Sequence, residues 1–413
     1  MLAEQFDAFL IDLDGVVYVG DALLPGASEA LQRLRSAGKA IRFLTNDPRP
    51  TRRELVERLT GLGVDAREEE IITCGWATAC SLRDEGIRTV SVLGSTGLRA
   101  ELEMVGIEVV DHSVPQAVVV GADERLGYRE LLWASRLILQ GAQFVAVNLD
   151  RWFPLPEGPA PATGAVVSAL QAATGRRPRV IGKPSAPMFE RALASLPVGC
   201  RVVMVGDNPE ADVVGAHQAG LPAILVAADP PRWPHANDFR VPDASIGTLL
   251  DLFEPGRSIR QWIRPAYPWP ERVVAAVAGV VRDRAGRLLL LRDAASGLPQ
   301  VPWGQVARGE SLTEAVVRVM REQVGIEVEI LRLTGVYSEP SLQILETPSG
   351  EVVQLVTCCL LCRANGVGFS RPVDGGARDA IWVFPDEMPP EIVPAHRRWL
   401  IDALGGDLGA AVG

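Results

Sequence analysis

Short runs of apolar residues that end abruptly in polar or glycine-bearing loops recur along residues 6–253 of this chain. Amphipathic helical stretches separate these runs, and the alternation predicts a parallel sheet with helices on both faces. The runs cover residues 8–11, 40–44, 180–181, 202–205 and 223–226. The first four lead into Asp12-Leu13-Asp14-Gly15, Thr45-Asn46-Asp47, Gly182-Lys183-Pro184 and Gly206-Asp207-Asn208. Because ligands bind at the carboxyl ends of strands in open α/β sheets, we expect these four loops to meet at one edge.

The chain has 413 residues, more than a single hydrophobic core usually organises, so several domains are expected. A second set of alternating segments between residues 71 and 177 indicates an inserted domain. A proline- and tryptophan-rich stretch after residue 253 is typical of a stiff linker, and a hairpin signal follows it. The expected division is a core of residues 1–70 and 178–254, an insertion of 71–177, a linker of 255–270 and a further domain of 271–405.

Composition and charge exclude several classes of protein. No apolar run approaches the length of a membrane span, so no membrane partner is expected. Glu4, Asp7 and Asp12 interrupt the segment in which a secretory signal needs an uncharged core, which favours a cytoplasmic protein. The net charge of −10 disfavours a nucleic-acid polymer as a partner. A single CxxC pair and the lack of HExxH argue against a structural zinc site.

Two carboxylates directly follow the first predicted strand, and they can take different tasks in phosphoryl transfer. Asp12 would attack phosphorus and become an aspartyl phosphate, while Asp14 would protonate the leaving oxygen and then activate water. A solvated acidic turn is the alternative reading of this pair. The chemistry requires counter-charge, because an anionic carboxylate must approach an anionic phosphate.

Mg²⁺ suits such a site because it prefers oxygen ligands, and Asp207 adds a third carboxylate after another predicted strand. We therefore expect a magnesium site made of Asp12, Asp14 and Asp207. Lys183 can neutralise the transferring group, and the Thr45 hydroxyl with nearby backbone amides can hold its oxygens. A lysine before a proline is by itself most often a surface residue, so the prediction rests on the ordered set of residues.

This ordered set resembles the four motifs of the haloacid dehalogenase (HAD) superfamily, and the chain is most similar to the branch that includes NagD and the p-nitrophenyl phosphatases. The resemblance implies a Rossmann-like α/β core with an α/β cap domain inserted between the second and third motifs. The family's nucleophile, acid/base, phosphate-binding threonine, lysine and metal-binding aspartate fall on Asp12, Asp14, Thr45, Lys183 and Asp207. Its next acidic position, which would support the site, falls on Asp212.

Three further positions concern the substrate. The branch often has Thr-Asn-Asn at the second motif, whereas this chain has Thr45-Asn46-Asp47, so Asn46 is expected at the phosphate beside an extra negative charge. That charge should alter substrate choice without abolishing the chemistry. In the cap, Asn148-Leu149-Asp150 resembles a segment that the branch places over the substrate. Asn148 and Asp150 are therefore candidate substrate-binding residues, with ordinary loop residues as the alternative.

Residues 304–326 resemble the Nudix box, a loop-helix-loop that binds divalent metal and cleaves a nucleoside diphosphate linked to another group. The residues in register are Gly304, Glu310, Arg318, Gly325 and Ile326. The resemblance implies an α+β Nudix-like domain at residues 271–405.

The box is degenerate, because the family places three carboxylates on one helix face where this chain has Val319, Glu322 and Gln323. Valine cannot coordinate magnesium, and glutamine offers only a neutral oxygen. Glu310 and Glu322 are expected to hold at most one weak ion, and the domain to hydrolyse diphosphates poorly or not at all. Trp303, Tyr337 and Trp382 are candidates for stacking on a base, with a place in the core as the alternative for each.

The sequence thus predicts a Mg²⁺-dependent phosphatase for a small phosphorylated metabolite, such as a sugar phosphate or a nucleotide, with a Nudix-like domain that binds a ligand or acts as a scaffold. Two alternatives stay open. In the first, the Nudix-like domain cleaves a nucleoside diphosphate conjugate and the HAD domain dephosphorylates the product. In the second, the whole chain is a ligand-responsive binding protein with vestigial catalysis. A nucleotide at the Nudix-like domain and a second copy of the chain are further candidate partners.

Overall fold

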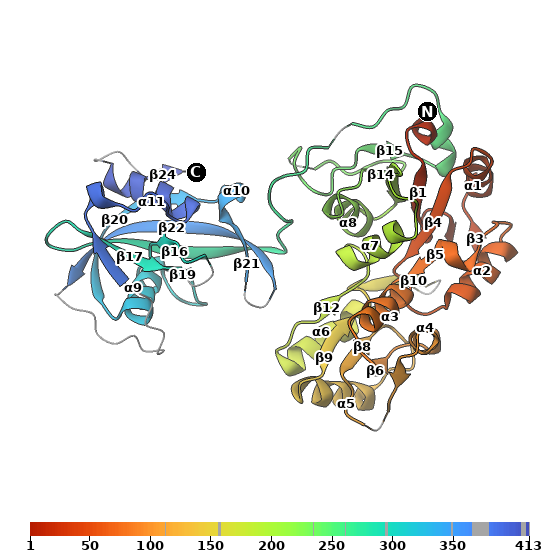
Figure 1. The fold of residues 1–413 in the computed structure, drawn as a ribbon, viewed down its shortest axis with the longest axis horizontal. Coiled ribbons are helices and arrows are strands. Elements are labelled where there is room, and N and C mark those ends of the chain that lie inside the picture. The colour runs from red at the N-terminus through yellow and green to blue at the C-terminus, as the bar shows by residue number, and fades with distance from the viewer. Residues whose placement is uncertain are drawn as a thin grey trace. The chain divides into compact units, whose positions relative to one another are not determined.

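The computed structural model describes residues 1–111, 113–155, 158–233, 235–260, 262–293, 296–347, 350–365, 380–405 and 410–412. The chain divides into two compact units, Met1–Arg264 and Pro265–Gly413. None of the helices in the described residues combines the length and the apolar character that crossing a membrane requires. The first unit contains two parallel sheets, and the second contains one mixed sheet (Figure 1).

The core of the first unit is a six-stranded parallel sheet in the order β15-β14-β13-β1-β4-β5. Its strands are β1 (Ala8–Asp12), β4 (Ala40–Thr45), β5 (Ile71–Thr73), β13 (Val202–Gly206), β14 (Ala223–Val226) and β15 (Ala244–Ile246). The helices beside it are α1 (Ala27–Ser36), α2 (Arg52–Gly61), α7 (Ala186–Ala194) and α8 (Val214–Gln218). Ala8 and Leu10 of β1 pack in one buried cluster with α7, whereas Phe9 and Ile11 pack in another with α1. Both faces of the sheet are therefore covered, as the apolar runs predict.

A second parallel sheet, in the order β12-β9-β8-β6-β7, is inserted between β5 and α7 (Figure 1). Its strands are β6 (Thr89–Leu93), β7 (Glu108–Val109), β8 (Ala117–Val120), β9 (Gln143–Ala146) and β12 (Arg179–Val180). The helices of this region are α3 (Cys74–Asp84), α4 (Thr96–Met104), α5 (Tyr128–Leu139) and α6 (Thr163–Thr174), and a hairpin joins β10 (Trp152–Leu155) to β11 (Gly158–Pro161). This sheet with its helices is called the cap below. The fold class expected from the sequence, an α/β core with an inserted α/β cap, is confirmed.

One strand assignment is wrong. The run at residues 180–181 was expected in the core sheet, but β12 pairs with β9 of the cap sheet, where Val180 lies opposite Ala146. β5 pairs with β4 and so belongs to the core sheet rather than to the insertion. These pairings move both ends of the expected insertion by a few residues, because short strands at a crossing take their partners from packing that the local pattern does not encode. We propose that the cap extends from residue 74 to residue 181.

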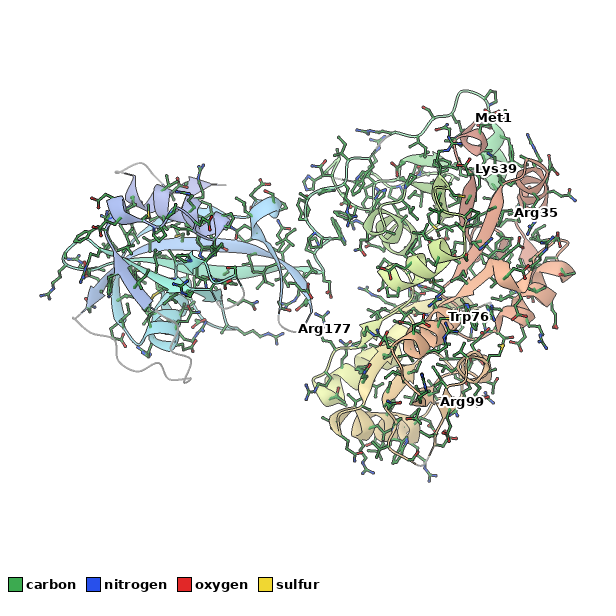
Figure 2. All side chains as sticks on the ribbon, viewed as in Figure 1. Met1, Arg35, Lys39, Trp76, Arg99 and Arg177 are labelled. Carbon is green, nitrogen blue, oxygen red and sulfur yellow. The ribbon has the colours of Figure 1, made fainter. Side chains whose placement is uncertain are left out.

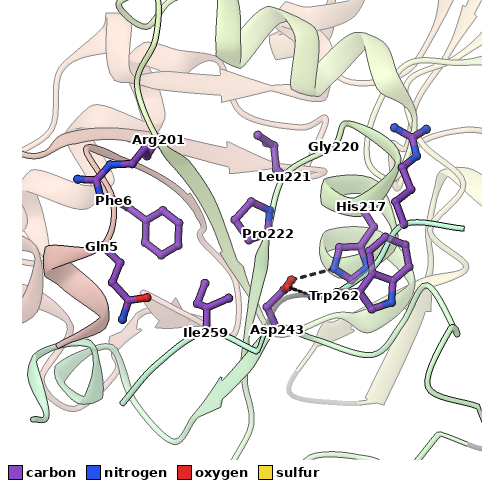
Figure 3. Close-up of a pocket in the computed structure, with 11 residues that line it drawn as sticks. Gln5, Phe6, Arg201, His217, Gly220, Leu221, Pro222, Asp243, Ile259 and Trp262 are labelled. Atoms are coloured by element: carbon purple, nitrogen blue, oxygen red, sulfur yellow. Dashed lines mark hydrogen bonds and ion pairs between the residues drawn. The ribbon is translucent and has the colours of Figure 1, made fainter. Parts of the chain in front are cut away.

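The first half of the expected linker is bound to the first unit. The indole ring of Trp262 stacks on the imidazole of His217, with ring centroids 3.9 Å apart, and its backbone N–H donates to Asp243 Oδ1 at 2.9 Å. Trp262 also lines a cavity of about 490 Å³ together with Phe6 and Arg201 (Figure 3). Phe6 and Arg201 precede β1 and β13, so this cavity lies at the amino ends of the core strands, opposite the edge at which the four loops were expected.

The second unit is built on a mixed sheet in the order β18-β17-β16-β22-β20-β24, with β19, β21 and β23 paired at its sides. The strands are β16 (Arg272–Arg282), β17 (Leu288–Arg292), β18 (Pro299–Gln300), β19 (Trp303–Gln305), β20 (Glu327–Tyr337), β21 (Ile344–Glu346), β22 (Val352–Asn365), β23 (Ala380–Val383) and β24 (Ala411–Val412). The helices are α9 (Leu312–Val324), α10 (Pro340–Gln343) and α11 (Pro394–Leu404). The predicted hairpin is present as the antiparallel pair β16 and β17. Val277 of β16 packs in a cluster with α9 and Ala278 in a cluster with α11, so the long central strand has a helix on each face.

Candidate functional site

Three of the four predicted loops meet at the carboxyl edge of the core sheet. Asp12 is the last residue of β1, Thr45 is the last residue of β4, and Asp207 follows β13. β1 pairs with both β4 and β13, so the ends of these strands are neighbours. The central position of β1 places Asp12 between the other two loops.

The ammonium group of Lys183 joins the loops to one another. Its Nζ donates to Asp12 Oδ1 and to Asp212 Oδ1, each at 2.7 Å, and to the carbonyl oxygen of Leu44 at 3.3 Å. These contacts use all three of its N–H donors, and the side chain is 3% exposed. Burial alone would lower the pKa of Lys183, but the Asp12 and Asp212 carboxylates outweigh it and raise that pKa above its ordinary value. Lys183 is therefore a fixed positive charge.

The carboxylates of Asp12, Asp207 and Asp212 each offer one oxygen within 4.8 Å of the others. Burial, strengthened by the Asp212 and Asp207 carboxylates and opposed by Lys183, raises the pKa of Asp12 well above its ordinary value. Partial burial and the Asp212 carboxylate raise the pKa of Asp207 to about 6. Three acidic groups thus repel one another around a single ammonium group. Such an excess of negative charge, carried by carboxylate oxygens, fits a divalent cation of the Mg²⁺ class.

Asp212 was expected as a supporting residue, and both of its carboxylate oxygens accept hydrogen bonds. Its Oδ1 accepts from Lys183, and its Oδ2 accepts from the backbone N–H of Asn208 at 3.0 Å. Both oxygens are thereby engaged, and the residue is 1% exposed. Asp212 fixes the loop that carries Asp207 and holds Lys183 in place.

Asp14 lies two residues beyond Asp12, and its side chain is exposed to solvent on one side while the rest packs against the protein. Partial burial of its carboxyl group and the neighbouring Asp47 carboxylate raise its pKa above the ordinary value of an aspartate. A raised pKa suits a group that must carry a proton and later accept one. The raised pKa and the exposure of Asp14 are compatible with the acid/base role that the family resemblance implies.

The extra charge at the second motif is neutralised within its own loop. The Asp47 carboxylate accepts from Arg49 Nε at 2.8 Å and from Arg49 Nη2 at 2.9 Å, a bidentate pair. The Arg49 guanidinium also lies over the ring of Phe153 in the cap hairpin, 4.3 Å from its centroid. The Thr45 hydroxyl accepts from the Asp47 backbone N–H at 3.0 Å and keeps its own O–H for donation. The sequence reasoning did not single out Arg49, although its opposite charge two residues after Asp47 was a usable signal.

Asn46, which directly follows β4, positions the backbone of Lys183. Its Oδ1 accepts from the Lys183 N–H at 2.9 Å, and its Nδ2 donates to the Lys183 carbonyl at 3.0 Å and to Asp150 Oδ1 at 3.3 Å. Asn148 Nδ2 donates to the Asn46 carbonyl at 2.6 Å, and the side chain of Asn148 is buried. Asn148 thus supports Asn46 in this arrangement, whereas the half-buried Asp150 stays a candidate for substrate contact.

Gly15 leaves the space that the Asp207 carboxylate occupies. Its φ of 80° lies in the left-handed region, and a Cβ at this position would lie 2.1 Å from Asp207 Oδ2. Gly206 likewise leaves space for the Asp212 carboxylate, because an added Cβ would lie 2.2 Å from the Asp212 Cγ. The turn after β1 and the end of β13 therefore need glycine for the acidic groups to converge.

In the second unit, the acidic residues of the Nudix-like box are bound by an arginine. Arg318 donates to both oxygens of Glu310, at 2.7 and 2.8 Å, and to Glu322 at 3.0 Å. The hydrogen bonds to Glu310 hold the pKa of Arg318 above its ordinary value against the effect of burial, and the same bonds lower the pKa of Glu310 to about 2. Among the described residues of this unit, no three acidic, cysteine or histidine groups form a metal-sized cluster.

The other two box positions face the protein interior. Val319 is 2% exposed and packs in the core cluster beneath α9, and a Cβ on Gly304 would lie 2.8 Å from its Cγ2. Gln323 Nε2 donates to the Trp303 carbonyl at 2.8 Å. Tyr337, one of the expected stacking residues, is 3% exposed, and its hydroxyl donates to Asp402, so it is a core residue.

Replacement of Gly15 by alanine tests whether the carboxylates of Asp12, Asp207 and Asp212 form the metal site. Gly20 is the matched control, because its φ is also positive, at 55°, but nothing lies within 4 Å of its added Cβ. We expect Gly15→Ala to weaken Mg²⁺ binding by at least about tenfold by displacing Asp207, and Gly20→Ala to lower stability alone. Calorimetric titration of both variants with Mg²⁺ measures the difference, and equal affinities would contradict the assignment.

Comparison with known proteins follows the same division of the chain. Residues 9–108 match the model of the haloacid dehalogenase-like hydrolases, residues 180–243 match a HAD-hydrolase-like model, and residues 272–403 match the NUDIX domain. Chronophin of Rattus norvegicus is 37% identical over 271 residues, which cover 60% of this chain and 88% of that protein. An acid sugar phosphatase of Staphylococcus haemolyticus is 33% identical over 225 residues, which cover 54% of this chain and 86% of the relative.

Solved structures resemble the first unit. Glycerol phosphate phosphatase of Mycobacterium tuberculosis, solved in complex with magnesium, has a TM-score of 0.57 and 32% identity over 61% of this chain and 77% of its own. NagD of E. coli K-12 has a TM-score of 0.55 and 28% identity over 60% of this chain and 98% of its own. The chain therefore belongs to the haloacid dehalogenase-like hydrolases, in the branch that includes NagD and the p-nitrophenyl phosphatases, and carries a Nudix domain after its HAD unit.

Proposed function

We propose that the first unit is a Mg²⁺-dependent phosphomonoester hydrolase that acts on a small phosphorylated metabolite, such as a sugar phosphate or a nucleotide. The observation that carries the proposal is the convergence of Asp12, Asp207 and Lys183 at one edge of the sheet. The names of the relatives, which include an acid sugar phosphatase and a glycerol phosphate phosphatase, support the substrate class. One relative was solved with magnesium and also with calcium, which supports a divalent ion at this site.

Asp12 acts as the nucleophile in this proposal. Lys183 holds its Oδ1, and the other carboxylate oxygen attacks phosphorus to form an aspartyl phosphate. Asp14 donates a proton to the leaving oxygen as the P–O bond to the alcohol breaks. Asp14 then takes a proton from water, which attacks phosphorus, releases inorganic phosphate and regenerates Asp12.

The other residues bind and orient. The Thr45 hydroxyl and the backbone amides after it hold the phosphate oxygens, and Lys183 balances part of their charge. Asn46 acts by keeping the Lys183 backbone in place, and Asp150 of the cap is available to the rest of the substrate. Asp12 and Asp207 would hold Mg²⁺ beside the Asp212 carboxylate, and its charge would let the anionic nucleophile approach the anionic phosphate. Asp14, the third ligand expected from the sequence, is not part of this group of carboxylates and keeps its side chain for proton transfer.

For the Nudix domain we propose a binding or scaffolding role without diphosphate hydrolysis, with a nucleotide as the candidate ligand. Arg318 occupies Glu310 and Glu322, and Val319 is part of the core, so the groups that would collect a metal are absent or already paired. Replacing Val319 with glutamate would bury a charge and would not recreate the metal site.

The Asp12→Asn variant tests the phosphatase mechanism. It keeps the size of the side chain and removes the nucleophile, so we expect the turnover of p-nitrophenyl phosphate with Mg²⁺ to fall by at least about 10³-fold. Asp21→Asn is the matched control, because the Asp21 side chain is fully exposed and should leave turnover unchanged. Phosphate release is measured for both variants in parallel with the parent. Full activity of Asp12→Asn would rule the mechanism out.

The inactivity of the Nudix domain is tested in the same Asp12→Asn background, in which the phosphatase cannot consume a product. Full-length protein is incubated with ADP-ribose and with Mg²⁺ or Mn²⁺, and release of AMP is followed by chromatography. We expect no AMP release above the rate without protein, because Val319 and Gln323 replace two of the three helix carboxylates and Arg318 pairs with the third, Glu322. AMP release that the further change Glu322→Gln removes would show an active Nudix site and favour the bifunctional alternative.

A further inference from the structure

Helix α4 of the cap contacts the segment that follows residues 45–47, which are called the phosphate-binding loop below. The segment runs from Pro48 to Arg52, between Asp47 and the start of α2. The hydroxyl of Ser95, the N-cap residue of α4, lies 3.1 Å from the Pro48 carbonyl oxygen and 3.0 Å from the Arg49 carbonyl oxygen, and it donates to this pair. Gly97, in the first turn of α4, lies so close that a Cβ would be 2.2 Å from the Arg49 carbonyl oxygen.

The strongest of these contacts comes from Glu101 on the same helix. Its Oε1 accepts from the backbone N–H of Arg52 at 2.6 Å, and its Oε2 lies 3.4 Å from Arg52 Nε. Glu101 is 0% exposed, and burial raises the pKa of its carboxyl group while the Arg52 contacts oppose the rise. Arg52 is fixed in turn, because it pairs with Glu68 at 3.0 Å and lies over the ring of Trp76, 3.4 Å from its centroid. Trp76 belongs to α3 and is labelled in Figure 2.

A fully buried carboxylate is costly to desolvate, and a well-packed apolar side chain often stabilises a fold as much or more. Stability alone therefore does not explain why an acidic group occupies this position. What Glu101 supplies, and an apolar residue does not, is an acceptor for a specific backbone N–H. That N–H belongs to the first residue of α2 and cannot pair within the helix, so the cap supplies its partner.

The effect of this contact reaches the phosphate-binding residues through a short series of bonds. Arg49 donates from its backbone N–H to Asp47 Oδ1 at 3.0 Å, and Asp47 donates from its backbone N–H to the Thr45 hydroxyl at 3.0 Å. The backbone from Thr45 to Arg52 is thus held at its start by β4 and at its end by the cap. A shift of Arg52 would move the groups that we assign to the phosphate.

We propose that Glu101 is a positioning residue for the phosphatase reaction, which fixes the phosphate-binding loop by holding the start of α2 from the cap. The cap therefore contributes to phosphate binding by holding the loop in position, in addition to covering the substrate. The inference rests on the proposed function, because it takes Thr45 and the backbone amides after it to bind the phosphate.

The test compares Glu101 with Glu70, another buried carboxylate that accepts from a backbone N–H but belongs to the core domain instead of the cap. Glu70 is 8% exposed, accepts from Arg35 at 2.7 and 2.8 Å, and accepts from the backbone N–H of Arg67 at 3.0 Å. Its partners lie outside the segment from Pro48 to Arg52. Glu70→Ala therefore removes a buried acidic acceptor of matched type without touching the loop.

Glu101→Ala, Glu101→Gln and Glu70→Ala are made in the full-length protein. For each, kcat and KM for p-nitrophenyl phosphate, the inhibition constant of inorganic phosphate and the melting temperature are measured with Mg²⁺. We expect Glu101→Ala to raise KM and the phosphate inhibition constant by about tenfold or more, because small misplacements of binding groups are costly, with a smaller change in kcat. Glu101→Gln keeps one acceptor oxygen and should recover part of the loss.

Glu70→Ala should lower the melting temperature but leave KM and the inhibition constant of inorganic phosphate within about twofold of the parent, since it acts on stability alone. The proposal is overturned if Glu101→Ala also leaves both constants unchanged, or if Glu70→Ala changes them equally. Should Glu101→Ala not fold, Ser95→Ala and Glu101→Gln decide, and unchanged constants in both would overturn it. Failure of the phosphatase assignment itself is recognised separately, because the parent protein would then lack turnover that depends on Asp12.

Discussion

The first unit is organised around one buried ammonium group. Lys183 lies between the carboxylates of Asp12 and Asp212, and its third donor reaches a carbonyl of β4. A charge buried to this extent is tolerated only when it is paired and fully hydrogen-bonded, so three strand ends must stay in register for the site to exist. The same contacts hold Asp12 in place and leave the cluster with an excess of negative charge, which is what a divalent cation requires.

Core and cap share the task of placing this group. Lys183 follows a strand of the cap sheet, and its ammonium group contacts Asp12 of β1. The Asn46 side chain of the core forms hydrogen bonds with the N–H and the carbonyl of Lys183. On the other side of the site, α4 of the cap holds the start of α2. The inserted region therefore does more than cover the active site, because both loops that contact the phosphate in our proposal depend on it for their position.

Strand ends were the part of the site that the sequence predicted best. Asp12, Thr45 and Asp207 each follow an apolar run, and the rule that parallel strands end at one edge was enough to bring them together. The strand before Lys183 was assigned to the wrong sheet, because two residues carry too little pattern to name their partner. Side-chain packing determines the other features of the site, and periodicity and spacing do not encode it. These features are the pairing of Asp47 with Arg49, the burial of Val319 and the hydrogen bond from the Arg52 N–H to Glu101.

The central claim is that these carboxylates converge on a divalent cation. Isothermal titration of the full-length protein with Mg²⁺, compared with its Asp207→Asn variant, tests this claim most directly. The account predicts one site per chain in the parent and an affinity at least about tenfold weaker in the variant, because a neutral amide replaces a carboxylate whose pKa is raised by partial burial and by the Asp212 carboxylate. Equal affinity in the two proteins would contradict it.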